Sequence, residues 1–248
     1  KQILLITLIS SLCALQDMTA GKKLIWSDEF EGTSLDQSKW VYEIGNNNGW
    51  GNSELEYYTN SNSNCYVNGG KLHIRAKRED MQGFKYTSSR IKTLGKFSFT
   101  YGYVEAKMSV PLSTGIWPAF WMLGENINSV GWPKCGEIDI MEAINREAKT
   151  YATNHWDENG HSMYGNSSGN FDITQMHTYA LDWNNKHIIA YVDGNKVNEM
   201  DISGNKGGTE EFHKPFFFLL NVAVGGTWPG FNVDEAALPQ ELVVDYIR

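Results

Sequence analysis

The sequence predicts an all-β protein, and two observations carry this prediction. Short alternating or apolar runs recur between clusters of Gly, Asn, Ser and Asp, a pattern typical of a sandwich or barrel, and long amphipathic helical periodicity is missing. The chain has 248 residues, and β-sandwiches of this length commonly form one domain. We find no repeat, linker or charge block, and therefore expect a single domain over residues 21–248.

Several stretches have the pattern of strands. Residues 71–76 and 101–108 alternate between apolar and polar side chains, which predicts strands with one buried face. Residues 188–192 lead into Asp193-Gly194, a strong hairpin signal, and residues 196–200 return. Residues 216–224 are almost continuously apolar, as in a strand buried on both faces, with Asn221 as the polar exception. Residues 242–247 predict a last strand.

One further stretch, residues 137–142, reads Glu-Ile-Asp-Ile-Met-Glu. In a strand, Glu137 and Asp139 share one face, and strict alternation would put residue 141 there next. Met141 occupies that position, so a β-bulge at Met141 is needed to return Glu142 to the acidic face, and bulges are common beside active sites. The hypothesis is a catalytic row with one acid as nucleophile and another as proton donor. The alternative is a solvated strand face that happens to be acidic.

Aromatic residues form a second pattern. The chain contains nine Trp, and four of them stand in segments that contain Gly or Pro at the ends of predicted strands: Trp117, Trp121, Trp132 and Trp228. Trp ring faces are good platforms for flat apolar ligand surfaces such as the C–H faces of sugars. The four together favour a lined groove, although any one Trp could instead cap an end of the sandwich. Residues 46–52, rich in Asn and Gly, predict an irregular loop.

Charge and the N-terminus restrict the partner and the compartment. A net charge of −8 argues against nucleic acid or an anionic membrane surface, and it is compatible with a neutral substrate. Residues 1–20 resemble a secretory signal peptide, with one Lys followed by an apolar run too short to span a bilayer. The alternative is a buried N-terminal strand. We expect a secreted, extracellular protein, in which Cys65 and Cys135 could pair or stay free. Asn166-Ser167-Ser168 is a glycosylation acceptor in a eukaryotic host.

A set of motifs runs in one order along the chain after residue 20. They are Trp26-Ser27-Asp28-Glu29-Phe30, Gly51-Asn52-Ser53-Glu54-Leu55-Glu56-Tyr57-Tyr58, Tyr86-Thr87-Ser88-Ser89-Arg90, Trp117-Pro118-Ala119-Phe120-Trp121, Glu137 to Glu142, and Leu220-Asn221 to Gly226. In order and spacing they resemble family 16 of the glycoside hydrolases, and among these the laminarinase-like endo-β-1,3-glucanases. The resemblance implies a β-jelly-roll of two curved antiparallel sheets with an open cleft. It also implies a monomer that hydrolyses β-glucan with retention and without a catalytic cofactor.

The resemblance assigns roles to the acidic strand. Glu137 would be the nucleophile, Glu142 the general acid/base and Asp139 the helper between them. Retaining enzymes need two carboxyl groups roughly 5 Å apart, and two long Glu side chains leaning inwards can approach that separation. His155 matches a position near the leaving group. From the sequence alone, a packed or exposed His at this position is equally reasonable.

The resemblance also implies cleft and metal positions. The expected substrate-binding residues are Asn52, Glu56, Arg90, Trp117, Trp121, Trp132, Asn221 and Trp228. Glu56 stands where relatives often carry Gln, and it would add a carboxylate if it faced the cleft. The family often binds a structural Ca²⁺ on the convex side, and the matching ligands here are Glu29, the backbone carbonyl of Gly70, and Asp245.

Two alternatives to a β-1,3-glucanase are open. The same fold cleaves mixed-linkage glucan, agarose and carrageenan, but sulfated galactans require a basic cleft, and the cleft motifs contain few Lys or Arg. Mixed-linkage glucan is plausible as a side substrate. A non-catalytic β-glucan recognition protein of the same fold would lack the glutamates, both of which are present here.

Overall fold

The structure, a computed structural model, describes residues 18–248. The predicted signal peptide, residues 1–20, therefore lies almost wholly outside the described residues. Among the residues that are described, no helix has the length and apolar character needed to cross a membrane.

Within residues 18–248, the strands form two sheets. The seven-stranded sheet has the spatial order β1 (Val41–Glu43), β6 (Arg90–Lys92), β15 (Phe216–Val224), β8 (Ile116–Gly124), β9 (Glu137–Glu142), β10 (Tyr151–Asp157) and β11 (His161–Ser167). The nine-stranded sheet has the order β14 (Asn195–Asp201), β13 (His187–Val192), β12 (His177–Trp183), β7 (Gly102–Ser109), β16 (Gln240–Ile247), β4 (Lys71–Met81), β5 (Phe84–Ser88) and β2 (Glu56–Tyr58), with β3 (Cys65–Asn68) paired to β4. The ladders are antiparallel except for the parallel pair β2–β5.

Helical segments are few and short in this part of the chain. They are η1 (Asn47–Gly49), α2 (Ile127–Val130), η2 (Ser203–Asn205), η3 (Glu210–His213) and η4 (Glu235–Ala237). All of them lie in connections between strands, which agrees with the missing helical periodicity of the sequence.

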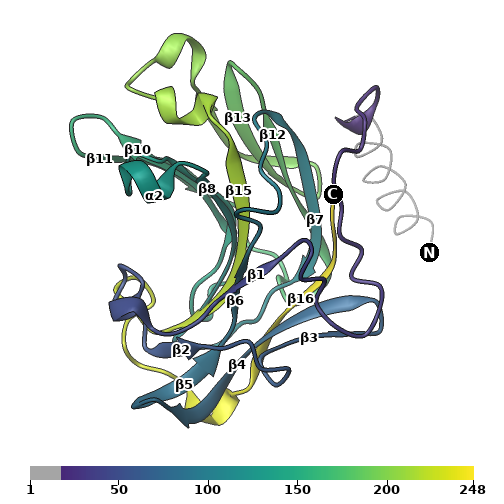
Figure 1. Ribbon diagram of the computed structural model, residues 1–248, viewed down its shortest axis with the longest axis vertical. Coiled ribbons are helices and arrows are strands. Elements are labelled where there is room, and N and C mark those ends of the chain that lie inside the picture. Colours follow the sequence, from purple (N-terminus) through teal and green to yellow (C-terminus); the bar gives the residue numbers. More distant parts are fainter. Residues whose placement is uncertain (1–17) are drawn as a thin grey trace.

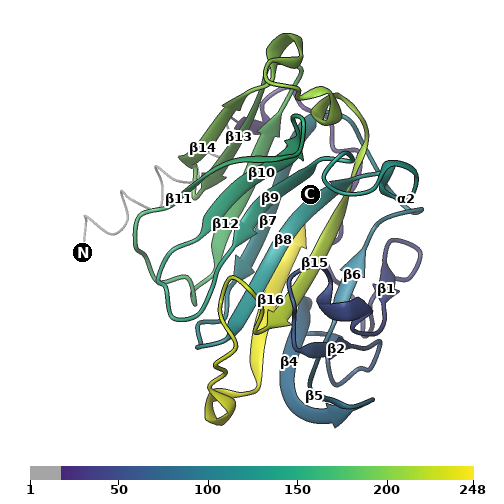
Figure 2. The same cartoon turned by 90° about the vertical axis from the view of Figure 1, so that its left-hand side faces the viewer.

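The two sheets are stacked and curved in the same sense, and the seven-stranded sheet forms the inner, concave layer (Figure 1). Its open face is seen in Figure 2, where β11, β10, β9, β8, β15, β6 and β1 follow one another across the molecule. The predicted all-β jelly roll is thus confirmed.

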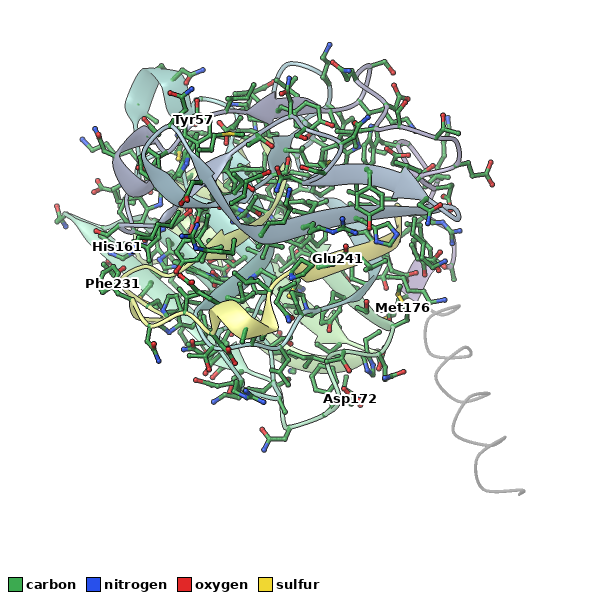
Figure 3. The ribbon with its side chains drawn as sticks, turned by 90° about the horizontal axis from the view of Figure 1, so that it is seen from below. Tyr57, His161, Asp172, Met176, Phe231 and Glu241 are labelled. Carbon is green, nitrogen blue, oxygen red and sulfur yellow. The ribbon has the colours of Figure 1, made fainter. Side chains whose placement is uncertain are left out.

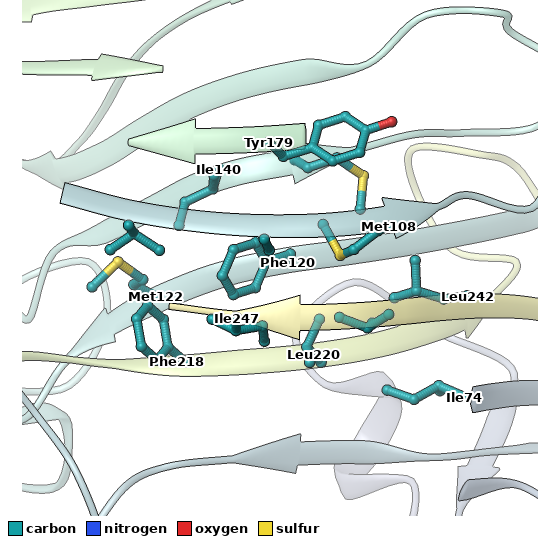
Figure 4. Packing of buried hydrophobic residues seen from close by; sticks show 14 of the residues in the cluster. Ile74, Met108, Phe120, Met122, Ile140, Tyr179, Phe218, Leu220, Leu242 and Ile247 are labelled. Carbon is teal, nitrogen blue, oxygen red and sulfur yellow. The ribbon is translucent and has the colours of Figure 1, made fainter. Parts of the chain in front are cut away.

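The core lies between the two layers (Figure 4). Phe120 of β8 lies near Met108 of β7, and Phe218 of β15 lies near Ile247 of β16, all within one buried cluster. Each of these side chains is at most 2% exposed. The alternation that places them there leaves the opposite side chains of β8, β9 and β15 to line the concave face.

Most predicted strands are found, some with longer bounds. Residues 216–224 form β15, and the apolar residues of 71–76 are buried in β4. The hairpin is also confirmed, because β13 and β14 flank Asp193 and Gly194, whose φ angles of 48° and 76° both lie in the left-handed region. A two-residue turn of this kind matches the twist of the paired strands.

The interpretation of residues 115–121 as a strand-end segment was wrong. Residues Ile116–Gly124 form β8, a central strand of the concave sheet. Proline cannot donate to a ladder and is normally absent from a central strand. The structure tolerates it because Pro118 pairs with Val222 of β15, whereas the pairing with β9 begins at Ala119.

Cys65 and Cys135 are both buried and free, so the disulfide left open by the sequence does not form. Cys135 packs with Leu123, Phe217 and Leu219 in a small apolar cluster on the concave side of the seven-stranded sheet.

Candidate active site

A β-bulge in β9 aims the third acid of the row. Opposite β8, Met141 pairs with Phe120 and Asp139 pairs with Trp121, which leaves Ile140 as the extra residue. Ile140 and Met141 are at most 2% exposed and both lie in the core, whereas Glu137, Asp139 and Glu142 line the cleft. The predicted bulge is therefore confirmed, with Ile140 rather than Met141 as the residue without a partner on β8.

Two tryptophan N–H groups hold the outer acids of the row. Trp132 Nε1 donates to Glu137 Oε2 over 3.0 Å. Trp117 Nε1 donates to Glu142 Oε1 over 2.9 Å. Asp139 lies between them and is 4% exposed. Each outer carboxyl thus has a fixed donor that limits its rotation.

Burial and mutual repulsion favour protonation of this row. Burial raises the pKa of Glu137 to about 8, the charge of Asp139 adds to this effect and His155 opposes it. Burial also raises the pKa of Asp139 well above its ordinary range. The pKa of Glu142 is raised as well, first by burial and then by the charges of Asp139 and Glu137. Neighbouring carboxyl groups in one dry site cannot all ionise at neutral pH.

His155 faces the acidic row. Its Nε2 atom lies 3.2 Å from Asp139 Oδ2 and 3.9 Å from Glu137 Oε1. Its other ring nitrogen, Nδ1, lies 2.8 Å from Nε2 of His161. His161 contacts the ring of Trp132 at a centroid distance of 4.6 Å. Burial and the neighbouring His155 lower the pKa of His161, which favours its neutral form.

A cleft of 1110 Å³ surrounds the acidic row. It contains all four predicted catalytic positions and every predicted substrate position except Glu56, namely Asn52, Arg90, Trp117, Trp121, Trp132, Asn221 and Trp228. The four predicted tryptophans are joined by a fifth, Trp50. The sequence prediction of a Trp-lined groove is thus confirmed, although Trp117 and Trp121 project from a strand.

Arg90 lines the cleft and is paired with Glu43. Its Nε donates to Glu43 Oε2 over 2.5 Å, and the same carboxylate accepts from Lys92 Nζ over 2.6 Å. The guanidinium carbon lies 4.5 Å from the ring centroid of Trp50 and 4.8 Å from that of Trp121. Arg90 is thus held between two rings and fixes their positions.

The prediction that Glu56 binds substrate was wrong. Glu56 is 0% exposed and lies behind the cleft wall, where its Oε2 accepts a hydrogen bond from the Val224 N–H over 2.6 Å. The carboxylate that reaches the cleft is that of Glu54, two residues earlier. Residues two apart in a strand point the same way, but Glu54 precedes β2 and does not follow that alternation.

The predicted calcium ligands do not fit a calcium site. The Glu29 carboxylate accepts two hydrogen bonds from Arg248, at 3.0 and 2.9 Å. Asp245 is paired with Lys71 over 3.1 Å and with Lys107 over 3.2 Å. Ca²⁺ requires six to eight oxygen ligands, and here the two carboxylates are already neutralised by cations of the same chain. In the described part of the chain, the grouped acid and His side chains close enough to share an ion are Glu137, Asp139 and His155, which belong to the acidic row.

Sequence reasoning missed several residues of the site. Glu43, Trp50, Glu54, His161 and Met163 all line the cleft. Trp50 lies in the predicted Asn- and Gly-rich loop beside Gly49 and Gly51, and the Gly–Trp pattern used for the other tryptophans could have found it. His161 is brought to His155 by the β10–β11 hairpin, in which Asp157 pairs with His161. That pairing depends on a turn that the sequence analysis did not identify.

The fold and the site agree with comparisons to known proteins. The sequence pattern of glycosyl hydrolases family 16 matches residues 52–248. The chain belongs to glycosyl hydrolase family 16. The solved laminarinase of Rhodothermus marinus, a structure to which this chain is similar, has a TM-score of 0.86 and 38% identity, covering 91% of this chain and 96% of that one.

Two curated relatives differ in how much of their own length this chain covers. A β-glucanase of Rhodothermus marinus is 38% identical over 244 residues, which cover 91% of this chain and 84% of the relative. The clotting factor G alpha subunit of Tachypleus tridentatus is 44% identical over 229 residues, which cover 91% of this chain but only 33% of that subunit. The predicted resemblance to family 16 and to its laminarinases is therefore confirmed.

Proposed function

We propose that the protein is a retaining endo-β-1,3-glucanase. The observation that carries the proposal is the bulge in β9, which brings Glu137, Asp139 and Glu142 to one face inside a tryptophan-lined cleft. Paired carboxyl groups with displaced proton affinities are the machinery of glycoside hydrolysis. The laminarinase and β-glucanase relatives support the same substrate class.

In the first step Glu137 attacks the anomeric carbon while Glu142 donates its proton to the glycosidic oxygen, so that the C–O bond breaks and a glycosyl ester forms on Glu137. The hydrogen bond from Trp132 and the nearby His155 favour the anionic form of Glu137. The raised pKa of Glu142 keeps its proton available. Asp139 raises the proton affinity of Glu142, which suits a proton donor. Its effect on Glu137 has the same direction and is opposed by Trp132 and His155.

In the second step Glu142 accepts a proton from water, and the water oxygen attacks the anomeric carbon. The ester bond to Glu137 breaks, which restores both carboxyl groups and leaves the product with its original configuration. His155, which lies 3.2 Å from Asp139, stabilises negative charge that develops in the row.

The cleft composition favours a neutral glucan. The cleft volume of 1110 Å³ exceeds the roughly 300–1,000 Å³ of small-molecule pockets, which fits a polymer. Both strongly basic lining residues, Arg90 and Lys92, are paired with Glu43. The same lining carries five acidic residues, Glu43, Glu54, Glu137, Asp139 and Glu142, so the cleft is not basic, which disfavours a sulfated galactan such as carrageenan.

The test is release of reducing ends from laminarin by the purified protein, with lichenan, curdlan, agarose and carrageenan in parallel. We expect laminarin and curdlan to be cleaved, lichenan more slowly, and the galactans not at all. Glu137→Gln and Glu142→Gln should abolish release, and Glu210→Gln, on an exposed residue of η3, should leave it unchanged. Binding of laminarin without release by the unmutated protein would establish the glucan-recognition alternative.

We also propose that the protein is secreted and monomeric. The signal-like composition of residues 1–20 supports secretion. N-terminal sequencing of protein recovered from the culture medium tests this proposal, since we expect residues up to about position 20 to be absent. Light scattering on the purified protein tests the monomer.

A further inference from the structure

The proposed mechanism does not use a second pair of carboxyl groups, Glu54 on the cleft wall and Glu56 behind it. Glu54 is 5% exposed and Glu56 is 0% exposed. Their carboxyl groups are close enough to interact by charge and by hydrogen bonding. Burying two carboxylates side by side is costly, because neither has water to solvate it and each repels the other. One member of such a pair is expected to keep a proton.

Hydrogen-bond directions identify which member carries the charge. Trp121 Nε1 donates to Asn221 Oδ1 over 2.8 Å, and Asn221 Nδ2 donates to the Tyr58 hydroxyl over 3.0 Å. Tyr58 then donates to Glu54 Oε2 over 3.0 Å, and Asn52 Nδ2 donates to Glu54 Oε1 over 3.2 Å. Both oxygens of Glu54 therefore accept, as an ionised carboxylate does.

Glu56 has the opposite pattern. Its Oε2 accepts from the Val224 N–H, but its Oε1 is buried and no donor among the described residues reaches it. An ionised oxygen that is buried without a donor costs folding free energy. A protonated oxygen at the same place needs only an acceptor, and the Glu54 carboxylate can serve as that acceptor. Burial, followed by the charge of Glu54, raises the pKa of Glu56 well above its ordinary range.

The surrounding titratable groups leave this assignment intact. Tyr58 of β2 stays neutral because burial raises its pKa well above the ordinary range. Arg90 of β6 lies near Glu54 and Tyr58 and interacts with both by charge. β5 places Tyr86 opposite Glu56 in the ladder, but its hydroxyl donates to Glu235. β15 presents only the uncharged groups of Val224 and Asn221.

We propose that Glu56 is a positioning residue that keeps its proton at neutral pH and donates it to Glu54, and that loss of this proton at alkaline pH loosens the hydrogen-bond chain to Trp121 and weakens substrate binding. The second half rests on the proposed glucanase function. If Glu56 were ionised, its carboxylate would repel that of Glu54, which is the last member of the hydrogen-bond chain Trp121–Asn221–Tyr58–Glu54. Glu137 and Glu142 are not part of this hydrogen-bond chain. Ionisation of Glu56 should therefore raise KM and leave kcat unchanged.

Stability tests the proton without any need for activity. Because the folded-state pKa of Glu56 is raised, its favourable contribution is full below the unfolded-state value of about 4.3 and is lost as the pH rises. Glu56→Gln keeps the shape and an N–H donor toward Glu54 but cannot ionise. We expect its Tm to exceed that of the unmutated protein by about 3 °C or more at about pH 9, with a smaller difference at about pH 5.

The kinetic arm uses laminarin over the same pH range. We expect the KM of the unmutated protein to rise about five-fold or more between about pH 6 and about pH 9, and that of Glu56→Gln to rise less than about two-fold, with parallel kcat profiles. Glu210→Gln, a matched change on an exposed glutamate, should follow the unmutated protein in both arms.

Equal pH dependence of Tm in Glu56→Gln and the unmutated protein would overturn the proposal, as would identical KM profiles. If Glu56→Gln does not fold, Glu54→Gln replaces it: removing the neighbouring charge should also flatten the pH dependence of Tm, and an unchanged slope would overturn the proposal. A protein that is inactive on every glucan contradicts the proposed function, while the stability arm still decides whether Glu56 holds its proton.

Discussion

At the scale of single residues, the hydrogen bond from Trp117 to Glu142 sets the alkaline limit of the reaction. Its N–H lowers the pKa of Glu142 against the larger effect of burial. Trp117→Phe removes the donor and keeps a ring, so the pKa of Glu142 should rise. Because Glu142 must be protonated to act as the acid, the alkaline limb of kcat should move up by about 0.5–1 pH unit.

The matched control for this change is Trp228→Phe. Trp228 packs edge-on against Trp117 at 5.4 Å but makes no hydrogen bond to Glu142 in the described structure. Trp228→Phe should raise KM and leave the alkaline limb of the kcat profile unchanged. A Trp117→Phe profile that coincides with that of the unmutated protein would show that Glu142 does not control the alkaline limb.

The buried Glu137 carboxyl lowers the stability of the folded protein at neutral and alkaline pH. Its folded-state pKa of about 8 exceeds the ordinary value of 4.5. Its favourable contribution to stability is therefore full below about pH 4.5 and is lost as the pH rises toward about 8. Glu137→Gln should be more stable than the unmutated protein at about pH 8 by about 1 kcal/mol or more, and the difference should shrink at about pH 5. Urea unfolding at both pH values measures this, and a constant difference would contradict it.

At the scale of elements, the bulge in β9 makes a distinctive prediction about Met141. Strict alternation would have put its side chain in the cleft, but the structure buries it in the core at 0% exposure. Met141→Ala should therefore cost about 2–5 kcal/mol of stability, as expected for loss of a buried methionine. Met163→Ala removes the same side chain from the cleft face of β11, where it is 59% exposed, and should cost under about 1 kcal/mol.

Chemical denaturation of the two methionine variants compares the two faces directly. Equal, small losses of stability would mean that Met141 is not in the core, and the account of how Glu142 reaches the cleft would then fail.

The elements also show how far sequence reasoning reaches. Residues 137–142 and 216–224 were correctly bounded because their apolar periodicity is set by one buried face or two. β8 was missed because its Trp and Pro residues were interpreted as a segment at a strand end, whereas Trp117 and Trp121, four residues apart, project from one face of a strand. The side-chain direction of Glu56 was missed because it depends on the irregular residues before β2, whose backbone the alternation rule does not describe.

At the scale of the whole molecule, the curvature of the seven-stranded sheet forms a groove on its concave face. The cleft runs across the seven-stranded sheet, from Trp50 beside β6 to His161 and Met163 on β11. In Figure 3, His161 and Phe231 both lie on the side toward which the concave layer opens in Figure 1. Phe231 is 60% exposed and follows the Trp228 loop.

The length of the groove leads to a prediction about product pattern. Because the lining spans the whole sheet, internal bonds of a glucan can reach the acidic row. Early digests of laminarin should contain oligosaccharides of several lengths, as chromatography would show. Release of glucose alone from the first time points would indicate an exo-acting enzyme instead.

The stereochemistry of hydrolysis tests the central claim most directly. If Glu137 forms a glycosyl ester and Glu142 assists both steps, proton NMR of a laminarin digest should show the β-anomer of the new reducing end first, with the α-anomer appearing only by slow mutarotation. Glu137→Gln should release neither anomer. First appearance of the α-anomer would contradict the account, because water would then have attacked directly and Glu137 could not be the nucleophile.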